Sequence, residues 1–447
     1  MFDRISDFAL GEVQVPQTAM AAAATLLIDT LGVAAGAAGM EAGRIARDHA
    51  VRFQAGGTAR DSATMMFDGR MASLTGAGFA AATQIDNLDA HDGYNPTKGH
   101  IGCAVVPALC VLAEQQPELL ARDALTAMVL AYEIAGRAAL ALHASVTDYH
   151  TSGAWNALGV AALGCRLRGH EPDQLRQALG IAEYHGPRSQ MVREIANPTM
   201  LHDGSGMGAM VGLMAVLLAE EGFAGAPAIT VEAEEVAAHW SDLGEVWTIE
   251  QNYIKPYPIC RWAHAAIDAL DKVMREYDLP ADAIDTVEVG TFREAAALYA
   301  GMPQTTSQAQ YSLPFALAVR WVHGAVGPDH IQGAGLSDAH VAQAVERIRV
   351  REVSRHSERF PVGRWSDVTL RLRDGRVLQS GDVHARGGPE APMDDATFEA
   401  KFRTMAASLA SERQDRLLGM RQRLLQPDAR FSELLELIHA PAEGGNG

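Results

Sequence analysis

The feature that most constrains the fold is a series of apolar segments of helical length between residues 18 and 222. Ala, Leu, Met and Gly recur in them at helical spacing, and several segments are apolar almost all round. Such helices have to be buried on several sides, and small residues allow their backbones to approach closely. This pattern predicts a helical bundle built from residues 18–35, 76–88, 101–114, 121–142, 152–168, 172–183 and 205–221.

The sequence changes character near residue 260. Residues 284–292 alternate β-branched and polar side chains, as a half-buried strand does. Residues 366–373 and 376–384 flank Asp374-Gly375, a strong hairpin signal, and residues 349–353 add a further candidate strand. Helical patterns lie among them, so about 260 to 395 reads as a separate α+β domain. The expected helices are 262–276, 312–322 and 340–347, with a helical tail over 394–437.

The charge balance limits the partners. Lys and Arg number 37 against 55 Asp and Glu, a net charge of −18, which repels nucleic acid and anionic membranes. The four cysteines form no CxxC pair, and the first twenty residues lack a signal-peptide pattern. The most apolar windows, 20–40 and 206–219, fall short of a clean span of about 20 residues. We therefore expect a cytoplasmic protein with no nucleic-acid partner and no membrane segment.

The densest polar segment is residues 86–100, between two apolar helical segments. It holds three acids, two histidines, a lysine and a tyrosine, more than a connecting turn requires. A solvated loop with helix caps is the alternative. His91, Asp92 and His100 offer metal-binding side chains, but no helical ligand pair such as His-Glu-x-x-His occurs, so we expect no metal.

Other candidates are scattered along the chain. His150 and His202 each precede a small-residue helix, where anions are favoured, although a structural histidine fits equally well. His185 and Arg188 form a basic pair at a helix exit, with a surface loop as the alternative. The Gly204-x-Gly206 segment imitates a dinucleotide fingerprint, but no strand precedes it, so no nicotinamide cofactor is expected.

Several motifs, in order along the chain, resemble the MmgE/PrpD family. They are the loop from Asp89 to His100 followed by Ala104-Val-Val-Pro107, Tyr149-His150 before a Gly/Ala helix, Leu201-His202-x-Gly204, Lys255-x-Tyr-Pro-x-Cys260, and Tyr311-Ser-Leu-Pro-Phe315. The resemblance extends over almost the whole chain.

The resemblance implies a mainly α fold. It predicts a large discontinuous all-helical bundle domain, residues 1–258 and 396–447, with a smaller inserted α+β domain, residues 259–395, and an active site at their interface. It also implies a homodimer that works without a cofactor. The family chemistry is removal of a proton next to a carboxylate of a di- or tricarboxylic acid, followed by loss of water, loss of carbon dioxide or reprotonation.

The family's site residues carry over to Asp89, His100, His150 and Lys255. The chain departs from the family at Thr199, where a lysine is usual, at Phe315, where a tyrosine is usual, and in the loop, which is one residue longer near Gly93. Lys98 and Tyr94 are the candidate replacements for the missing charge and hydroxyl. The predicted catalytic residues are Asp89, His100, His150, Lys98 and Tyr94, and the predicted substrate-binding residues are His91, Asp92, His202, Lys255, Arg261 and Arg188.

These residue types suit the chemistry. Imidazole accepts a proton near neutral pH, and we expect Asp89 or Asp92 to orient such a ring. Cations must face the carboxylate on which charge develops. The predicted function is a cofactor-independent lyase, hydro-lyase-like, acting on a small anionic carboxylate. An epimerase or isomerase using the same proton step, a metal-dependent hydrolase and a catalytically inactive binding protein are the alternatives.

Overall fold

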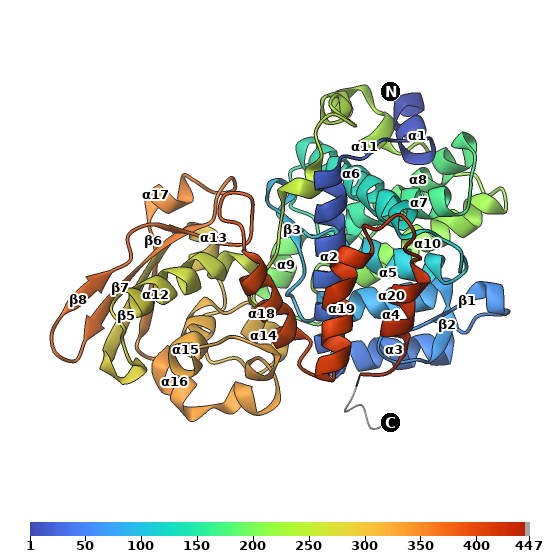
Figure 1. The fold of residues 1–447 in the computed structure, drawn as a ribbon. Coiled ribbons are helices and arrows are strands. Elements are labelled where there is room, and N and C mark those ends of the chain that lie inside the picture. The colour runs from blue at the N-terminus through green and yellow to red at the C-terminus, as the bar shows by residue number, and fades with distance from the viewer. Residues whose placement is uncertain (443–447) are drawn as a thin grey trace. The chain divides into compact units, whose positions relative to one another are not determined.

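The computed structural model describes residues 1–442 and separates the chain into two compact units (Figure 1). Unit 1 consists of residues 1–191, 201–252 and 405 onward, and unit 2 of residues 192–200 and 253–404. The protein is mostly α-helical, as predicted. The domain boundaries at 258/259 and 395/396 stay predictions, and residues 443–447 of the predicted helical domain lie outside the described part.

Unit 1 is built mainly from helices. Each of the seven segments with helical periodicity is a helix, with ends within a few residues of those predicted. The described helices are α1 (Phe2–Leu10), α2 (Gln17–Ala37), α3 (Glu41–Phe53), α4 (Leu74–Asp86), α5 (Gly102–Ala113), α6 (Ala121–Ser145), α7 (Gly153–Leu167), α8 (Pro172–His185), α10 (Ser205–Glu220), α11 (Ile229–Glu232), α19 (Ser411–Arg423) and α20 (Ser432–His439). A short hairpin, β1 (Ser62–Thr64) with β2 (Met71–Ser73), and β3 (Gly93–Tyr94) complete it.

Helix α7 lies at the centre of the bundle and packs against α5, α6, α8 and α10. Small residues make this packing possible. A Cβ at Gly159 would come within 2.8 Å of the Ala131 carbonyl oxygen on α6, and one at Gly212 within 2.6 Å of the Ala157 carbonyl oxygen on α7. The Ala- and Gly-rich composition is therefore what lets these helices approach so closely.

The C-terminal helices complete the same bundle. Helix α19 packs against α2, so the two ends of the chain lie side by side in unit 1 (Figure 1). The Ser408 hydroxyl donates to the Ala35 carbonyl at 3.1 Å, and the Phe431 amide donates to the Leu119 carbonyl at 2.9 Å. Unit 1 is thus discontinuous in sequence.

Unit 2 has a mixed sheet with the strand order β6-β5-β7-β8, and β9 also pairs with β7. Strand β5 runs parallel to β6 and antiparallel to β7. The strands are β5 (Ile284–Thr291), β6 (Ile348–Glu352), β7 (Trp365–Leu372), β8 (Val377–Gln379) and β9 (Val383–His384), with β4 (Asn252–Tyr253) at the start of the unit. The helices are α9 (Met191–Ala196), α12 (His264–Glu276), α13 (Arg293–Ala296), α14 (Thr306–Gln310), α15 (Leu313–His323), α16 (Ala339–Val345), α17 (Ser354–Ser357) and α18 (Asp395–Met405).

The predicted hairpin forms, but its second strand differs from the prediction. Asp374-Gly375 makes the turn, with Gly375 at a φ of +88°. Residues 376–384 were expected as one strand, and the structure divides them into β8 and β9. Gly381 interrupts the pairing because its φ of +64° is not an extended conformation.

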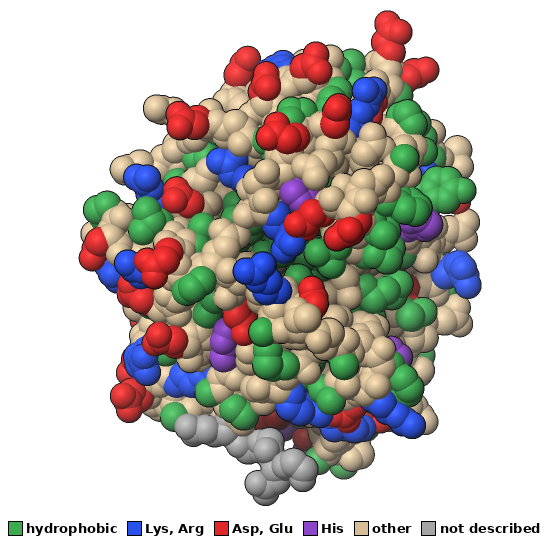
Figure 2. Space-filling view, turned by 90° about the vertical axis from the view of Figure 1, so that its right-hand side faces the viewer, with side chains coloured by type: hydrophobic (Ala, Val, Ile, Leu, Met, Phe, Trp, Pro, Cys, Tyr) green, Lys and Arg blue, Asp and Glu red, His purple; other side chains and the backbone are tan. Residues whose placement is uncertain are grey.

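Two helices pass a simple test for membrane spans. By length and composition α2 and α6 are apolar enough to cross a bilayer, so the segment at 20–40 is longer than expected, whereas α10, which contains 206–219, is a shorter apolar helix as expected. Within the protein, 72% of the apolar window in α2 and 89% of that in α6 are buried. Core helices of a bundle have this same character. On the face shown in Figure 2, acidic and basic side chains are interspersed.

Candidate active site

The polar loop between α4 and α5 is buried rather than solvated. His91, Asp92 and Thr97 have no exposed surface, and Asp89 and His100 are 4% and 7% exposed. The alternative of a solvated connecting loop therefore does not apply. Burying this many polar side chains is costly unless they bind one another, so their partners define the site.

His100 is held in a single orientation. Its Nδ1 lies 2.6 Å from the Asp92 carbonyl oxygen, and its backbone amide donates to the Ser152 Oγ at 3.0 Å. A carbonyl oxygen only accepts, so Nδ1 carries the hydrogen, and Nε2 is the ring nitrogen without a hydrogen in the neutral form. The sequence suggested a carboxylate for this task, but Asp92 holds the ring through its backbone, and its carboxylate accepts from the Tyr132 hydroxyl at 3.2 Å.

Asp203 faces the other nitrogen of the same ring. Its Oδ2 lies 3.8 Å from the His100 Nε2. Its Oδ1 accepts from the Ser152 hydroxyl at 2.6 Å and from the Ser152 amide at 3.2 Å, immediately before α7. The loop between α4 and α5, the start of α7 and the segment before α10 thus meet at one histidine.

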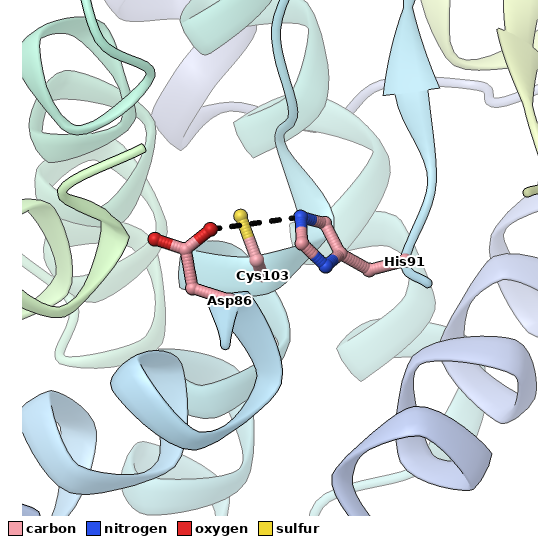
Figure 3. Close-up of side chains that lie close together, drawn as sticks. All are labelled: Asp86, His91 and Cys103. Atoms are coloured by element: carbon pink, nitrogen blue, oxygen red, sulfur yellow. Dashed lines mark ion pairs between the residues drawn. The ribbon is translucent and has the colours of Figure 1, made fainter. Parts of the chain in front are cut away.

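His91 and Asp86 form a second histidine–carboxylate pair (Figure 3). The Nε2 of His91 is 3.8 Å from the Asp86 Oδ1, and the His91 ring contacts the His100 ring edge-on at a centroid distance of 4.5 Å. The Asp86 Oδ2 accepts from the Ser205 amide at 3.1 Å. Burial, together with the charges of nearby Asp203 and Asp89, raises the pKa of Asp86 well above its usual value, which favours a protonated carboxyl.

Some of these groups have donor atoms close enough to share a metal ion. Asp86, His91 and Cys103 form one such group (Figure 3), and Asp89, His91 and His100 form another. Carboxylate, imidazole and thiolate are donors that zinc accepts. The Cys103 thiol, however, donates to the Ser205 hydroxyl at 3.0 Å, and burial raises its pKa. We therefore assign no metal to the group that contains Cys103, and the expected absence of a metal at the site stays a prediction.

A third candidate group lies in unit 2. It consists of His356, Asp367 and Asp382. The Arg355 guanidinium is hydrogen-bonded to both of these carboxylates, so a cation from the chain already balances their charge. An ion-pair network describes this cluster better than a metal site.

Lys98 and His150 belong to an adjacent cluster with His143 and Tyr149. The Lys98 ammonium lies 4.5 Å from the centroid of the Tyr149 ring. The His150 amide donates to the His143 Nε2 at 3.3 Å, and the two imidazole rings are stacked with centroids 6.4 Å apart. Burial, and then the charges of Lys98 and His150, lower the pKa of His143 to about 4. Because Lys98 is two residues before His100, and His150 two before Ser152, this cluster adjoins the first.

Three further predicted site residues are Tyr94, Arg188 and His202. The Tyr94 amide donates to the Gly99 carbonyl at 2.8 Å and closes the loop, and burial, with Glu133 of α6 nearby, raises the Tyr94 pKa to about 12. Arg188 is about one-third exposed and lies 3.7 Å from Glu183. His202 is buried directly before Asp203.

Backbone strain concentrates in this region. Five non-glycine residues in the described chain have positive φ angles, and three of them are Asp89 (+53°), Lys98 (+54°) and His202 (+46°). Such conformations are costly and persist where the surrounding structure imposes them, often at functional sites. The strained backbone conformations therefore fall in the same region as the hydrogen bonds around His100.

Lys255 and Arg261 lie in unit 2 and are buried there. Arg261 donates to the Arg386 and Ala385 carbonyls at 2.6 and 3.0 Å, and its guanidinium lies 4.3 Å from the Tyr253 ring centroid. Burial lowers the Arg261 pKa to about 10. Their predicted role in substrate binding stays a prediction from the resemblance.

Sequence reasoning missed the groups that orient the histidines. Ser152 and Asp203 stand beside His150 and His202 in the motifs, and their positions before predicted helices were the available signal. Asp86 was visible only as the first acid of the loop. His143, seven residues before His150, carried no signal.

The fold and the site define a mainly helical protein with a buried acid–base centre, in which one histidine has a fixed tautomer and a carboxylate facing its Nε2. Comparison with known sequences gives the particular family. The MmgE/PrpD N-terminal domain matches residues 7–246 and the MmgE/PrpD C-terminal domain matches residues 257–425, so the chain belongs to the MmgE/PrpD family. This membership supports an enzyme of the MmgE/PrpD type with lyase- or dehydratase-like activity.

Characterised relatives agree with this assignment at low identity. Cis-aconitate decarboxylase of Aspergillus terreus is 23% identical over 431 residues, which cover 83% of this chain and 81% of the relative. The cis-aconitate decarboxylase-like protein oryM of Aspergillus oryzae is 22% identical over 419 residues, which cover 82% of each chain.

Proposed function

We propose that the protein is a cofactor-independent lyase that removes a proton α to a carboxylate of a di- or tricarboxylic acid, most simply as a hydro-lyase. The observation that carries this proposal is the fixed tautomer of His100. Its Nδ1 hydrogen is committed to the Asp92 carbonyl, which leaves Nε2 as the nitrogen that accepts a proton.

The proposed reaction balances without a redox partner. The C–H bond breaks and its proton moves to the His100 Nε2, while the electron pair forms a carbon–carbon double bond. This double bond forms as the bond between the adjacent carbon and its hydroxyl breaks, and the hydroxyl leaves as water after taking a proton from an acid. The Asp86 carboxyl, with its raised pKa, provides a proton within the same buried network. Lys98 supplies positive charge for a substrate carboxylate.

Two other outcomes use the same residues. An epimerase would return the proton to the opposite face of the carbon, and the contact between His91 and His100 offers two imidazoles for that exchange. The relatives named cis-aconitate decarboxylase make loss of carbon dioxide the third outcome, in which the site protonates carbon instead. The metal-dependent hydrolase remains the least favoured alternative.

One experiment separates these reactions. The protein is incubated in deuterated water with citrate-, malate- and aspartate-like acids and with cis-aconitate, and the products are followed by NMR. A hydro-lyase forms an unsaturated acid, an epimerase places deuterium in recovered substrate, and a decarboxylase releases carbon dioxide. Loss of activity on chelation, with metal bound stoichiometrically, would favour the hydrolase.

The matched variants are His100→Gln and His340→Gln. We expect His100→Gln to lower the rate by about 100- to 10,000-fold, the usual contribution of a general base. His340 lies in unit 2 with its side chain 82% exposed, so His340→Gln should behave as the unsubstituted protein. Exchange with none of the acids, or equal rates in the two variants, contradicts the proposal.

A further inference from the structure

Asp203 and Ser152 form a support for His100 that neither the sequence motifs nor the relatives assign. The Ser152 hydroxyl group accepts from the His100 amide at 3.0 Å and donates to the Asp203 Oδ1 at 2.6 Å. One hydroxyl group therefore ties the histidine backbone to the carboxylate. The other oxygen of Asp203 is left facing the His100 Nε2 at 3.8 Å.

The backbone around Asp203 leaves little freedom for this arrangement to change. The Gly153 amide donates to the Asp203 carbonyl at 2.9 Å, and a Cβ at Gly153 would come within 2.3 Å of the Gly204 carbonyl oxygen. Gly204 itself has a φ of +68°. The start of α7 is thus packed directly on the Asp203–Gly204 segment.

We infer that Asp203 is a positioning residue that stabilises His100 after the ring has taken a proton on Nε2, and that Ser152 holds Asp203 in place. The protonated ring has two N–H donors. The Nδ1 donor already has the Asp92 carbonyl, and the Nε2 donor finds Asp203 after a small closing of the 3.8 Å gap. Both donors and the new positive charge are then satisfied inside the protein.

His91, Asp86 and Asp89 are arranged differently around the His100 ring. The edge of the His91 ring contacts His100, and Asp86 pairs with His91 rather than with His100. Asp89 has a carboxylate oxygen within 4.8 Å of His91 and His100 ring nitrogens and adds negative charge. Asp203 differs because Ser152 binds one of its oxygens and so directs the other at Nε2.

The inference deepens the proposed function and rests on His100 as the proton acceptor, but its first test needs no substrate. The full-length protein is labelled with ¹⁵N-histidine, and the ring signals of His100 are followed against pH, with His100→Gln to assign them. We expect Asp203→Asn to move the titration midpoint of His100 to lower pH by about one unit or more, because the ring loses its facing carboxylate. Asp203→Glu should restore part of this shift.

A matched control lies in unit 2. The Asp338 carboxylate also caps a helix, accepting from the His340 and Val341 amides, and its Oδ2 lies 2.9 Å from the His323 Nε2. Asp338→Asn should shift His323 and leave the His100 signals unchanged. Ser152→Ala should shift His100 in the same direction as Asp203→Asn but less, and it replaces Asp203→Asn as the test if that variant does not fold.

Activity measurements then separate the positioning role of Asp203 from the proposed lyase reaction. Once an acid that the enzyme converts has been identified, Asp203→Asn should lower kcat more than it changes KM. It should also shift the acid limb of the pH profile. An unchanged His100 titration in folded Asp203→Asn and Ser152→Ala overturns the inference, even if the enzyme is active. A shifted titration without turnover of any acid supports the positioning role and counts against the proposed lyase.

Discussion

The Tyr149 hydroxyl donates a hydrogen bond to the backbone carbonyl of Lys98, while the Lys98 ammonium lies 4.5 Å from the centroid of the same tyrosine ring. One side chain thus binds both the backbone and the charge of Lys98. This contact holds a lysine with a left-handed backbone conformation two residues before His100. It provides a structural reason to test Lys98 as the charge that faces the substrate.

We expect Lys98→Met to lower kcat/KM by about 100-fold, the usual effect of losing one donor that stabilises a developing anion. Lys272→Met is the control, because Lys272 belongs to unit 2, where its ammonium donates to the Ser380 carbonyl at 2.7 Å. Steady-state kinetics on the acid identified by NMR measure both variants. Equal kcat/KM values in the two would remove Lys98 from the catalytic set.

Gly102 allows Asp92 and Tyr132 to approach the start of α5. A Cβ there would come within 2.2 Å of the Asp92 Oδ1 and 2.4 Å of the Tyr132 hydroxyl oxygen. Gly102→Ala should therefore destabilise the protein by about 1 to 3 kcal/mol, as overpacking does. Gly419→Ala is the matched change in α19, with nothing within 4 Å of the new Cβ, and should be neutral or slightly stabilising. Urea unfolding measures both, and an unaffected Gly102→Ala would contradict the packing argument.

The low pKa of His143, about 4, predicts a stability that depends on pH. Between pH 6.5 and 4 the unfolded chain binds a proton at this position and the folded chain does not, so the free energy of unfolding should fall as the pH falls. The loss attributable to His143 is at most about 3 kcal/mol, since its side chain is partly exposed. His143→Gln should flatten this part of the curve in urea unfolding at pH 4 to 7. A curve as steep as that of the unsubstituted protein would show that His143 is not responsible.

Glu133 predicts the opposite slope. Burial raises its pKa to about 7, although its Oε1 accepts from the Thr248 hydroxyl at 2.9 Å and Arg137 lies 3.6 Å away. Between pH 4.5 and 7 the folded state holds the proton more tightly, so this group should lower the free energy of unfolding as the pH rises, by up to about 3 kcal/mol. Glu133→Gln keeps the acceptor and should remove that decline. Parallel curves for the two proteins over this range would refute the assignment.

The helical periodicity was sufficient to predict most of the secondary structure. The segments that became α2, α4, α5, α6, α7, α8 and α10 were recognisable because a buried helix needs only local spacing and apolar side chains. The same holds for β5 and for the turn at Asp374-Gly375. The prediction of one continuous strand over residues 376–384 was wrong, because Gly381 has a left-handed conformation and separates β8 from β9.

The candidate site was only partly predictable. The loop containing Asp89, His91 and His100 was identified from its polar density alone, and the structure brings these three together. The residues that orient these histidines were not identified, because they come from distant parts of the sequence and are brought close only by folding. Asp203, for example, reaches Ser152 across 51 residues of sequence.

The sequence by itself determined where the buried helices run, that a chemically dense loop joins two of them, and that the chain carries the motifs of the MmgE/PrpD family. These properties follow from the spacing and composition of residues within short segments, and such local patterns do not depend on the tertiary structure. Only the tertiary structure decided that Asp92 holds His100 through its backbone, that Asp203 faces the Nε2 of His100, and that Asp86 lies where burial favours its protonated form. Those outcomes depend on the close packing of α4, α5, α7 and α10, which sets distances of a few ångströms between residues far apart in the chain.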